Sequence, residues 1–120
     1  MSEKNTKFPY NLERYGMKFD LELLESIDEY QVNHFLPFRS GAILELIRLG
    51  LMHANNPLNI IKRKSYGEKG DSLLLSLSYP VPLLDQIDNY KQNKSLTTRA
   101  SAINELIQIG LQNPLEASEA

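Results

Sequence analysis

The stretch LLESIDEY at residues 23–30 returns as LLDQIDNY at residues 83–90, and this repetition decides the fold. A second pair follows at the same offset of 60, where AILELIRLGL at residues 42–51 matches AINELIQIGL at residues 102–111. Aligned without a gap, the two copies share 15 identities over 39 positions, far more than unrelated segments share. The chain therefore contains two copies of one structural unit.

Two copies predict one shared core rather than a solenoid. A solenoid usually needs about three repeats or more, and a unit of this size buries too little surface to fold alone. Two copies instead resemble the halves of a symmetric dimer joined in one chain. We divide the 120 residues into an N-terminal arm (1–12), a first motif (13–54), a linker (55–72), a second motif (73–113) and a tail (114–120).

Each copy opens on an alternating stretch that predicts a β-strand of about seven residues. In the first copy, one face holds Tyr15, Met17 and Phe19, and the other holds Arg14, Gly16 and Lys18. In the second copy, one face holds Leu73, Leu75, Leu77 and Tyr79, and the other holds Leu74, Ser76 and Ser78. A lone strand leaves its backbone groups unpaired, so we expect the two strands to form an antiparallel ribbon with one face against the helices.

A helix with one apolar face follows each strand. Its apolar residues recur at a spacing of three or four, which is typical of an amphipathic helix. We expect Asp20 to cap this helix in the first copy, because its carboxylate can accept from the free N–H groups of the first turn. In the second copy, Pro80 and Pro82 are expected to open the helix.

A second apolar-faced helix completes each copy. Thr98 is a suitable N-cap in the second copy, whereas Phe38 at the equivalent place in the first copy cannot cap through its side chain. We expect Gly50 and Gly110 to end these helices. Between the copies, residues 58–66 are consistent either with a further strand or with a loop docked on the core.

The order strand, helix, turn, helix resembles the ribbon-helix-helix family of DNA-binding proteins, which includes the Arc and MetJ repressors. The resemblance rests on the Leu-Leu-x-x-Ile-Asp-x-Tyr first helix and on the Arg-x-x-Ala-Ile-x-Glu-Leu-Ile-x-x-Gly-Leu second helix, both present twice. It implies a mainly α fold with a short antiparallel β-ribbon, formed by two motifs as an intramolecular pseudo-dimer. Two polypeptides normally contribute one strand each in this family, so this chain looks like a tandem single-chain form.

The resemblance implies that the ribbon enters the major groove of double-stranded DNA, where the face opposite the helices reads the bases. The base-reading residues would be Arg14, Gly16, Lys18, Leu74, Ser76 and Ser78. Gly16 and Leu74 depart from the long polar residues usual in the family. Leu74 can offer only an apolar contact, which weakens the case for base reading by the second copy. The alternative is that these residues form only the solvent face of a sheet, with Leu74 packed under the linker.

The resemblance also implies phosphate binding at the start of each second helix, where backbone N–H groups and the helix dipole favour an anion. The residues concerned are Arg39 and Ser40 in the first copy, and Thr98 and Arg99 in the second. For both arginines the alternative is an ion pair with a nearby carboxylate. The basic linker cluster Lys62-Arg63-Lys64 is a further candidate for contact with the DNA backbone, or else a solvated loop.

The amino-acid composition argues against several classes of protein function. The 13 Lys and Arg against 15 Asp and Glu give a net charge of -2, which argues against coating of nucleic acid by bulk charge but not against a local basic face. Cysteine is absent, and His34 and His53 have no metal-ligand spacing, so we predict no enzyme activity, no cofactor and no metal. The N-terminus has no apolar leader and no run is long enough for a membrane span, so we expect a cytoplasmic protein associated with the nucleoid or a plasmid.

Two classes of function remain after these exclusions. The first is sequence-specific DNA binding, as a transcriptional repressor or as an accessory factor of a conjugative relaxosome, with further copies on adjacent subsites and a relaxase as a candidate partner. The second is an antitoxin-like or scaffold module that contacts a protein such as a toxin, with DNA binding secondary. Pairing of the first motif with the first motif of another chain is an alternative to pairing within one chain.

Overall fold

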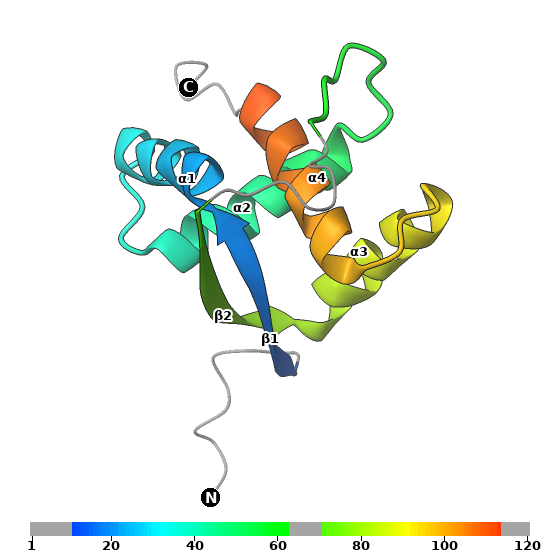
Figure 1. The fold of residues 1–120 in the computed structure, drawn as a ribbon, viewed down its shortest axis with the longest axis horizontal. Coiled ribbons are helices and arrows are strands. Elements are labelled where there is room, and N and C mark those ends of the chain that lie inside the picture. Colours follow the sequence, from blue (N-terminus) through cyan, green and yellow to red (C-terminus); the bar gives the residue numbers. More distant parts are fainter. Residues whose placement is uncertain (1–10, 63–70, 114–120) are drawn as a thin grey trace, which may run out of the picture.

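The computed structural model describes residues 11–62 and 71–113, in which strand, helix and helix follow one another twice (Figure 1). The elements are β1 (Leu12–Asp20), α1 (Leu21–Asn33), α2 (Arg39–Met52), β2 (Ser72–Pro80), α3 (Val81–Asn93) and α4 (Arg99–Gln112). The fold is therefore mainly helical with one short antiparallel ribbon, as predicted.

The ribbon pairs β1 with β2 antiparallel along their whole length. Its register places Gly16 opposite Ser76, two residues that are themselves equivalent at the offset of 60. Met17 and Tyr79 are buried on the inner face, in agreement with the predicted alternation. Leu73 was expected on the same face but is 45% exposed, because it lies next to the residue where β2 begins, at the end of the ribbon.

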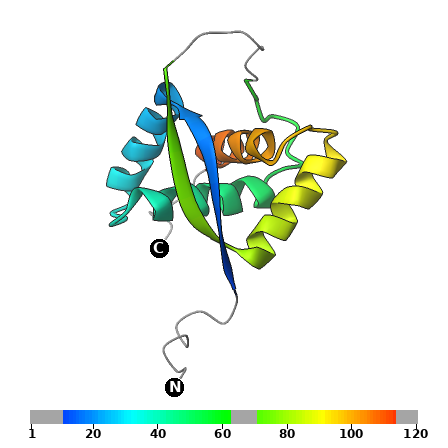
Figure 2. The same cartoon turned by 60° about the horizontal axis from the view of Figure 1, so that its bottom comes forward.

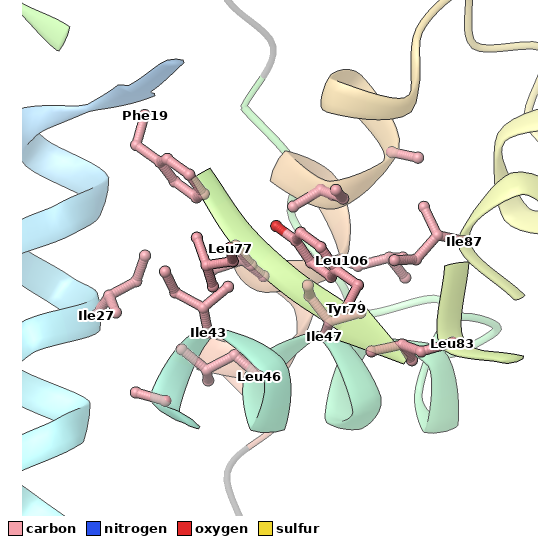
Figure 3. Close-up of a cluster of buried hydrophobic side chains, with 14 of the residues drawn as sticks. Phe19, Ile27, Ile43, Leu46, Ile47, Leu77, Tyr79, Leu83, Ile87 and Leu106 are labelled. Atoms are coloured by element: carbon pink, nitrogen blue, oxygen red, sulfur yellow. The ribbon is translucent and has the colours of Figure 1, made fainter. Parts of the chain in front are cut away.

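The helices lie behind one face of the ribbon. Figure 2 shows the two strands lying across α2 and α4, with α1 and α3 at either side. The side chains that fill the space between these layers come from both copies and form one hydrophobic cluster (Figure 3). Its labelled members include Phe19, Ile43 and Leu46 of the first copy and Tyr79 and Leu106 of the second. The cluster thus draws its members from both copies.

The two repeated glycines allow α2 and α4 to cross in close contact. A Cβ added at Gly50 would lie 2.1 Å from the carbonyl oxygen of Leu106, and one added at Gly110 would lie 2.2 Å from that of Leu46. Such distances are impossible for real atoms, so each position requires a residue without a side chain. The prediction that these glycines end the helices is wrong, because α2 runs on to Met52 and α4 to Gln112.

The helix N-termini differ in how they are capped. Asp20 occupies the N-cap position of α1 with extended backbone, but its side chain makes no capping hydrogen bond. Thr98 caps α4 as predicted, because its Oγ1 accepts from the backbone N–H of Ser101 at 3.0 Å. Phe38 stands at the N-cap of α2 without a side-chain hydrogen bond, and Pro80 stands at the N-cap of α3.

None of the helices in the described ranges is long and apolar enough to cross a membrane.

The described part of the linker is a docked loop and not a strand. The side-chain amide of Gln112 accepts from the backbone N–H of Ile60 at 2.8 Å and donates to its carbonyl. Gln108 makes the same pair of bonds with Lys62, at 2.7 and 2.9 Å. Ile61, between them, packs against the core. Two glutamines of α4 thus hold this segment in place, which resolves the alternative left open by the sequence as far as residue 62.

Candidate nucleic-acid interface

The outer face of the ribbon brings the six predicted base-reading residues together. Five of them are exposed and the sixth, Ser78, is half-buried. The register pairs Arg14 with Ser78, Gly16 with Ser76, and Lys18 with Leu74. Two cations of β1 therefore stand at the two ends of this face, with a flat centre between them, because Gly16 has no side chain.

Arg14 reaches across the ribbon to the opposite strand. Its Nη1 donates to the hydroxyl of Ser78 at 3.2 Å, and its Nη2 donates to the backbone carbonyl of Ser76 at 3.0 Å. Both bonds lie on the exposed surface. The guanidinium consequently lies over β2 rather than extending freely from β1.

The other end of the face is different in character. Lys18 lies opposite Leu74, whose side chain is 64% exposed and can offer only apolar contact. The described part of the linker does not cover Leu74, so packing under residues 55–62 does not account for this leucine. The mixed pair of an ammonium and an aliphatic group can approach a base edge together with a thymine methyl group.

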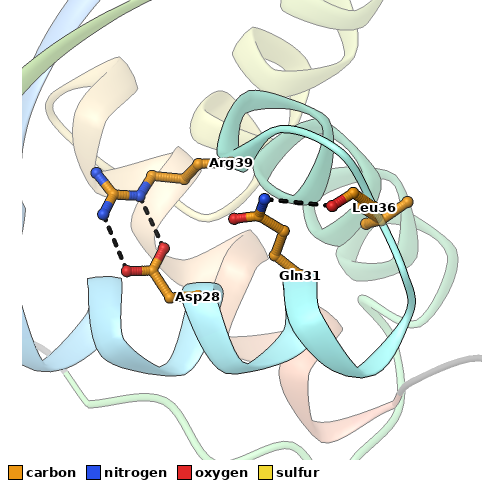
Figure 4. Close-up of polar contacts among 4 residues, drawn as sticks. All are labelled: Asp28, Gln31, Leu36 and Arg39. Carbon is orange, nitrogen blue, oxygen red and sulfur yellow. Dashed lines mark hydrogen bonds and ion pairs between the residues drawn. The ribbon is translucent and has the colours of Figure 1, made fainter.

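Arg39 and Arg99 each form a bidentate ion pair with an aspartate of the preceding helix. Arg39 donates through Nε and Nη2 to the carboxylate of Asp28 at 2.8 and 2.9 Å (Figure 4). Arg99 binds Asp88 in the same way, at 2.9 and 2.8 Å. This is the alternative that the sequence left open for both arginines. Any phosphate contact through their guanidinium groups would compete with these carboxylates.

The Arg99 ion pair affects the charge of its partner. Hydrogen bonding from Arg99 lowers the pKa of Asp88 below its ordinary value, while partial burial of the carboxyl group acts in the opposite direction. The same bond raises the pKa of Arg99, so both groups stay ionised around neutral pH. Charge-assisted, bidentate pairs of this kind fix side-chain geometry well.

The start of α4 lies beside β1. The guanidinium of Arg99 stands 5.1 Å from the ring centroid of Tyr15 and 4.0 Å from a carboxylate oxygen of Glu13. The first turn of α4 is therefore next to the ribbon. The hydroxyl of Thr98 is engaged in two hydrogen bonds with Ser101. It accepts from the backbone N–H as the helix cap and donates to the side-chain hydroxyl at 2.9 Å.

The remaining predicted phosphate contacts are placed only in part. Ser40 lies in the first turn of α2 and is exposed. Lys62 is exposed, and its backbone is held by Gln108 of α4. Arg63 and Lys64 lie outside the described residues, so their role stays a prediction.

The two histidines follow helices and have local partners. His34 is the C-cap of α1, and its ring stacks on Tyr30 with centroids 3.9 Å apart. His53 is the C-cap of α2. Within the described residues, no three His, Cys, Asp or Glu side chains lie together in a way that could hold a metal ion.

The sequence reasoning did not predict a tyrosine–glutamate pair that occurs once in each motif. Tyr30 donates to Glu45 at 2.6 Å, and Tyr90 donates to Glu105 at 3.1 Å. Glu105 is almost completely buried. A signal was present, because both members of each pair, like both members of the Asp–Arg pairs, are identical in the two copies. Polar identities that recur together between repeats therefore indicate contacts within one motif.

The exposed ribbon face offers hydrogen-bond donors from Arg14, Lys18 and two serine hydroxyls, together with an apolar methyl surface from Leu74. This set can bind acceptor-rich edges such as those of bases, and it does not form an acid, base and nucleophile constellation. No protein-family model, curated protein or solved structure matches this chain. Its function must therefore be inferred from the repeat and from this geometry.

Proposed function

We propose that this chain is a tandem ribbon-helix-helix protein that binds double-stranded DNA, with both halves of the usual dimer in one polypeptide. Contacts that recur at the offset of 60 support the pseudo-dimer. Leu21 donates to the carbonyl of Asp71 at 3.1 Å, and its equivalent Val81 donates to Asn11 at 2.9 Å. The paired glycine contacts between α2 and α4 follow the same rule.

The observation that carries the DNA-binding proposal is the polar outer face of the ribbon, which is exposed among the residues that the structure describes. The major groove of B-DNA is about 12 Å wide and admits a two-stranded ribbon, and each base pair presents a distinct hydrogen-bond pattern there. The face with Arg14 and Lys18 is turned away from the helices and is free to enter the groove. The net charge of -2 is an average over the whole chain, and two cations, Arg14 and Lys18, lie on the face proposed to enter the groove.

The two strands differ at every position of this face, so one chain would bind an asymmetric subsite. Because a single ribbon covers only a few base pairs, we expect two or more chains to occupy adjacent subsites. Occupancy of a promoter would make the protein a repressor. Occupancy of a transfer origin would make it a relaxosome accessory factor, with a relaxase as a partner, in the cytoplasm.

Removal of the two ribbon cations tests this function. We expect the double variant Arg14→Ala/Lys18→Ala to bind a duplex selected from random DNA at least about tenfold more weakly than the parent. The matched control is Arg48→Ala/Lys91→Ala, which removes the same charges from α2 and α3. Fluorescence anisotropy at several salt concentrations measures the affinities, and parental binding should weaken steeply with salt.

The outcome separates the proposal from its alternative. If the ribbon variant binds as tightly as the parent, or if the control weakens binding equally, the ribbon is not the reading surface. A parent that selects no duplex at all would contradict DNA binding and favour the antitoxin-like or scaffold function.

A further inference from the structure

Among the described residues, Arg14 is the one cation of the outer face that is hydrogen-bonded to the opposite strand. A guanidinium has five N–H donors, and Ser78 and the Ser76 carbonyl engage two of them. Three donors remain for a ligand, enough for a bidentate contact. The planar group is thus oriented before any DNA arrives, so less side-chain freedom is lost on binding.

The opposite end of the ribbon cannot form an equivalent brace. At the offset of 60, Leu74 takes the place of Arg14 and Lys18 takes the place of Ser78. The leucine side chain can neither donate nor accept a hydrogen bond. An ammonium on a flexible stem also lacks the fixed fork of a guanidinium, so it discriminates poorly between neighbouring acceptors. The two ends therefore differ in how sharply they can specify a base.

We propose that Ser78 is a positioning residue that acts through Arg14, and that the Arg14 end of the ribbon is the specificity-determining end. This inference rests on the proposed DNA binding. The ligand chemistry is the edge of a guanine, whose O6 and N7 accept the parallel donors of an oriented guanidinium. Ser78 holds Arg14 in place rather than reading a base itself, which differs from the role that the resemblance implied for it.

The two serines of β2 provide a matched pair of variants. Ser78 contributes its side-chain hydroxyl to Arg14, whereas Ser76 contributes only its backbone carbonyl. Replacement of Ser76 by alanine leaves that carbonyl in place, but replacement of Ser78 removes the acceptor. Ser78→Thr keeps a hydroxyl on a strand residue and serves as the conservative variant.

The experiment measures affinity for a selected duplex and for the duplexes that differ from it by one base pair. We expect Arg14→Ala to abolish the preference at one guanine position, and Ser78→Ala to lower the preference at that same position about threefold or more. Ser78→Thr should keep the parental preference at that position. Ser76→Ala should also keep it there, because the carbonyl that holds Arg14 remains, and any loss that it causes should fall at a different base pair. The double variant Arg14→Ala/Ser78→Ala should match Arg14→Ala alone, because Ser78 acts only through the arginine.

Several outcomes would overturn this inference. Ser78→Ala with parental preference at the Arg14 position, or with a loss at a different base pair, means that Ser78 does not position Arg14. Additive losses in the double variant would make Ser78 an independent reader. Circular dichroism of each variant shows whether it is folded. If the parent selects no sites, the proposed function itself fails, which is a different result from selective binding that ignores Ser78.

Discussion

At the scale of single residues, Tyr79 carries a buried hydroxyl that lacks a hydrogen-bond partner in the described part of the chain. Its side chain is fully buried, and its hydroxyl has no hydrogen-bond partner among the described residues (Figure 3). The equivalent residue of the first copy is Phe19, which is also fully buried and has no hydroxyl. The fold therefore accepts a phenyl ring at this position in one copy, and the hydroxyl of Tyr79 costs desolvation energy without a bond in return.

We predict that Tyr79→Phe raises the free energy of unfolding at pH 7 by about 1 kcal/mol, because it removes an unpaired buried hydroxyl. Burial raises the pKa of Tyr79 to about 12, above an unfolded value near 10. The folded state therefore holds the Tyr79 proton more tightly than the unfolded state does, so the parent loses stability as the pH rises from 10 to 12, and the phenylalanine variant should lose less. Chemical denaturation at pH 7 and pH 11 checks both effects. A variant less stable than the parent at pH 7 would mean that the hydroxyl has a partner.

At the scale of elements, the crossing of α2 and α4 is the most demanding contact of the fold. Each helix places a glycine against the backbone of the other, so no side chain separates them at these points. Gly41 lies in the first turn of α2 and has open space around it, since an added Cβ would meet nothing within 4 Å. Within α2, therefore, Gly50 has no room for a side chain, whereas Gly41 has.

Alanine substitutions separate these roles. We predict that Gly50→Ala lowers the free energy of unfolding by about 3 kcal/mol, because the new methyl group would overlap the backbone of Leu106. Gly41→Ala should instead raise it by about 0.5 kcal/mol through helix propensity. Urea denaturation of the two variants provides the measurement. Equal effects of the two substitutions would show that α2 and α4 do not cross at Gly50.

The repeat predicted the order of the elements and the pairing of the strands, but not the role of the glycines. A glycine before the end of a helix and a glycine at a helix crossing look the same in local sequence, and only the neighbouring helix distinguishes them. The docked linker was equally hidden, because Gln108 and Gln112 read as ordinary exposed positions of α4. The bond from Arg14 to Ser78 depends on strand register, which the sequence alone did not specify.

At the scale of the whole molecule, the antiparallel ribbon closes within a single chain. Strand β1 pairs with β2, and the helices of both copies share one core. This arrangement predicts that the free protein is monomeric, with a solution mass of 13.7 kDa. Its melting temperature should not change with protein concentration, because unfolding involves no dissociation.

Light scattering coupled to size exclusion measures the mass directly. A mass of two chains together with a melting temperature that rises with concentration would indicate that the motifs pair between chains. On DNA, by contrast, several chains are expected to bind side by side. The mass of the free protein and the number of chains per duplex are therefore separate quantities.

The central claim is that the outer face of the ribbon binds DNA, and nuclear magnetic resonance tests it most directly. Backbone amide signals of the full chain are followed while a selected duplex is added. The account predicts that the largest shifts fall in β1 and β2, at Arg14, Lys18 and Ser76, with smaller shifts in the first turns of α2 and α4. Shifts concentrated on α1 and α3 with an unchanged ribbon, or no shifts at all, would contradict it.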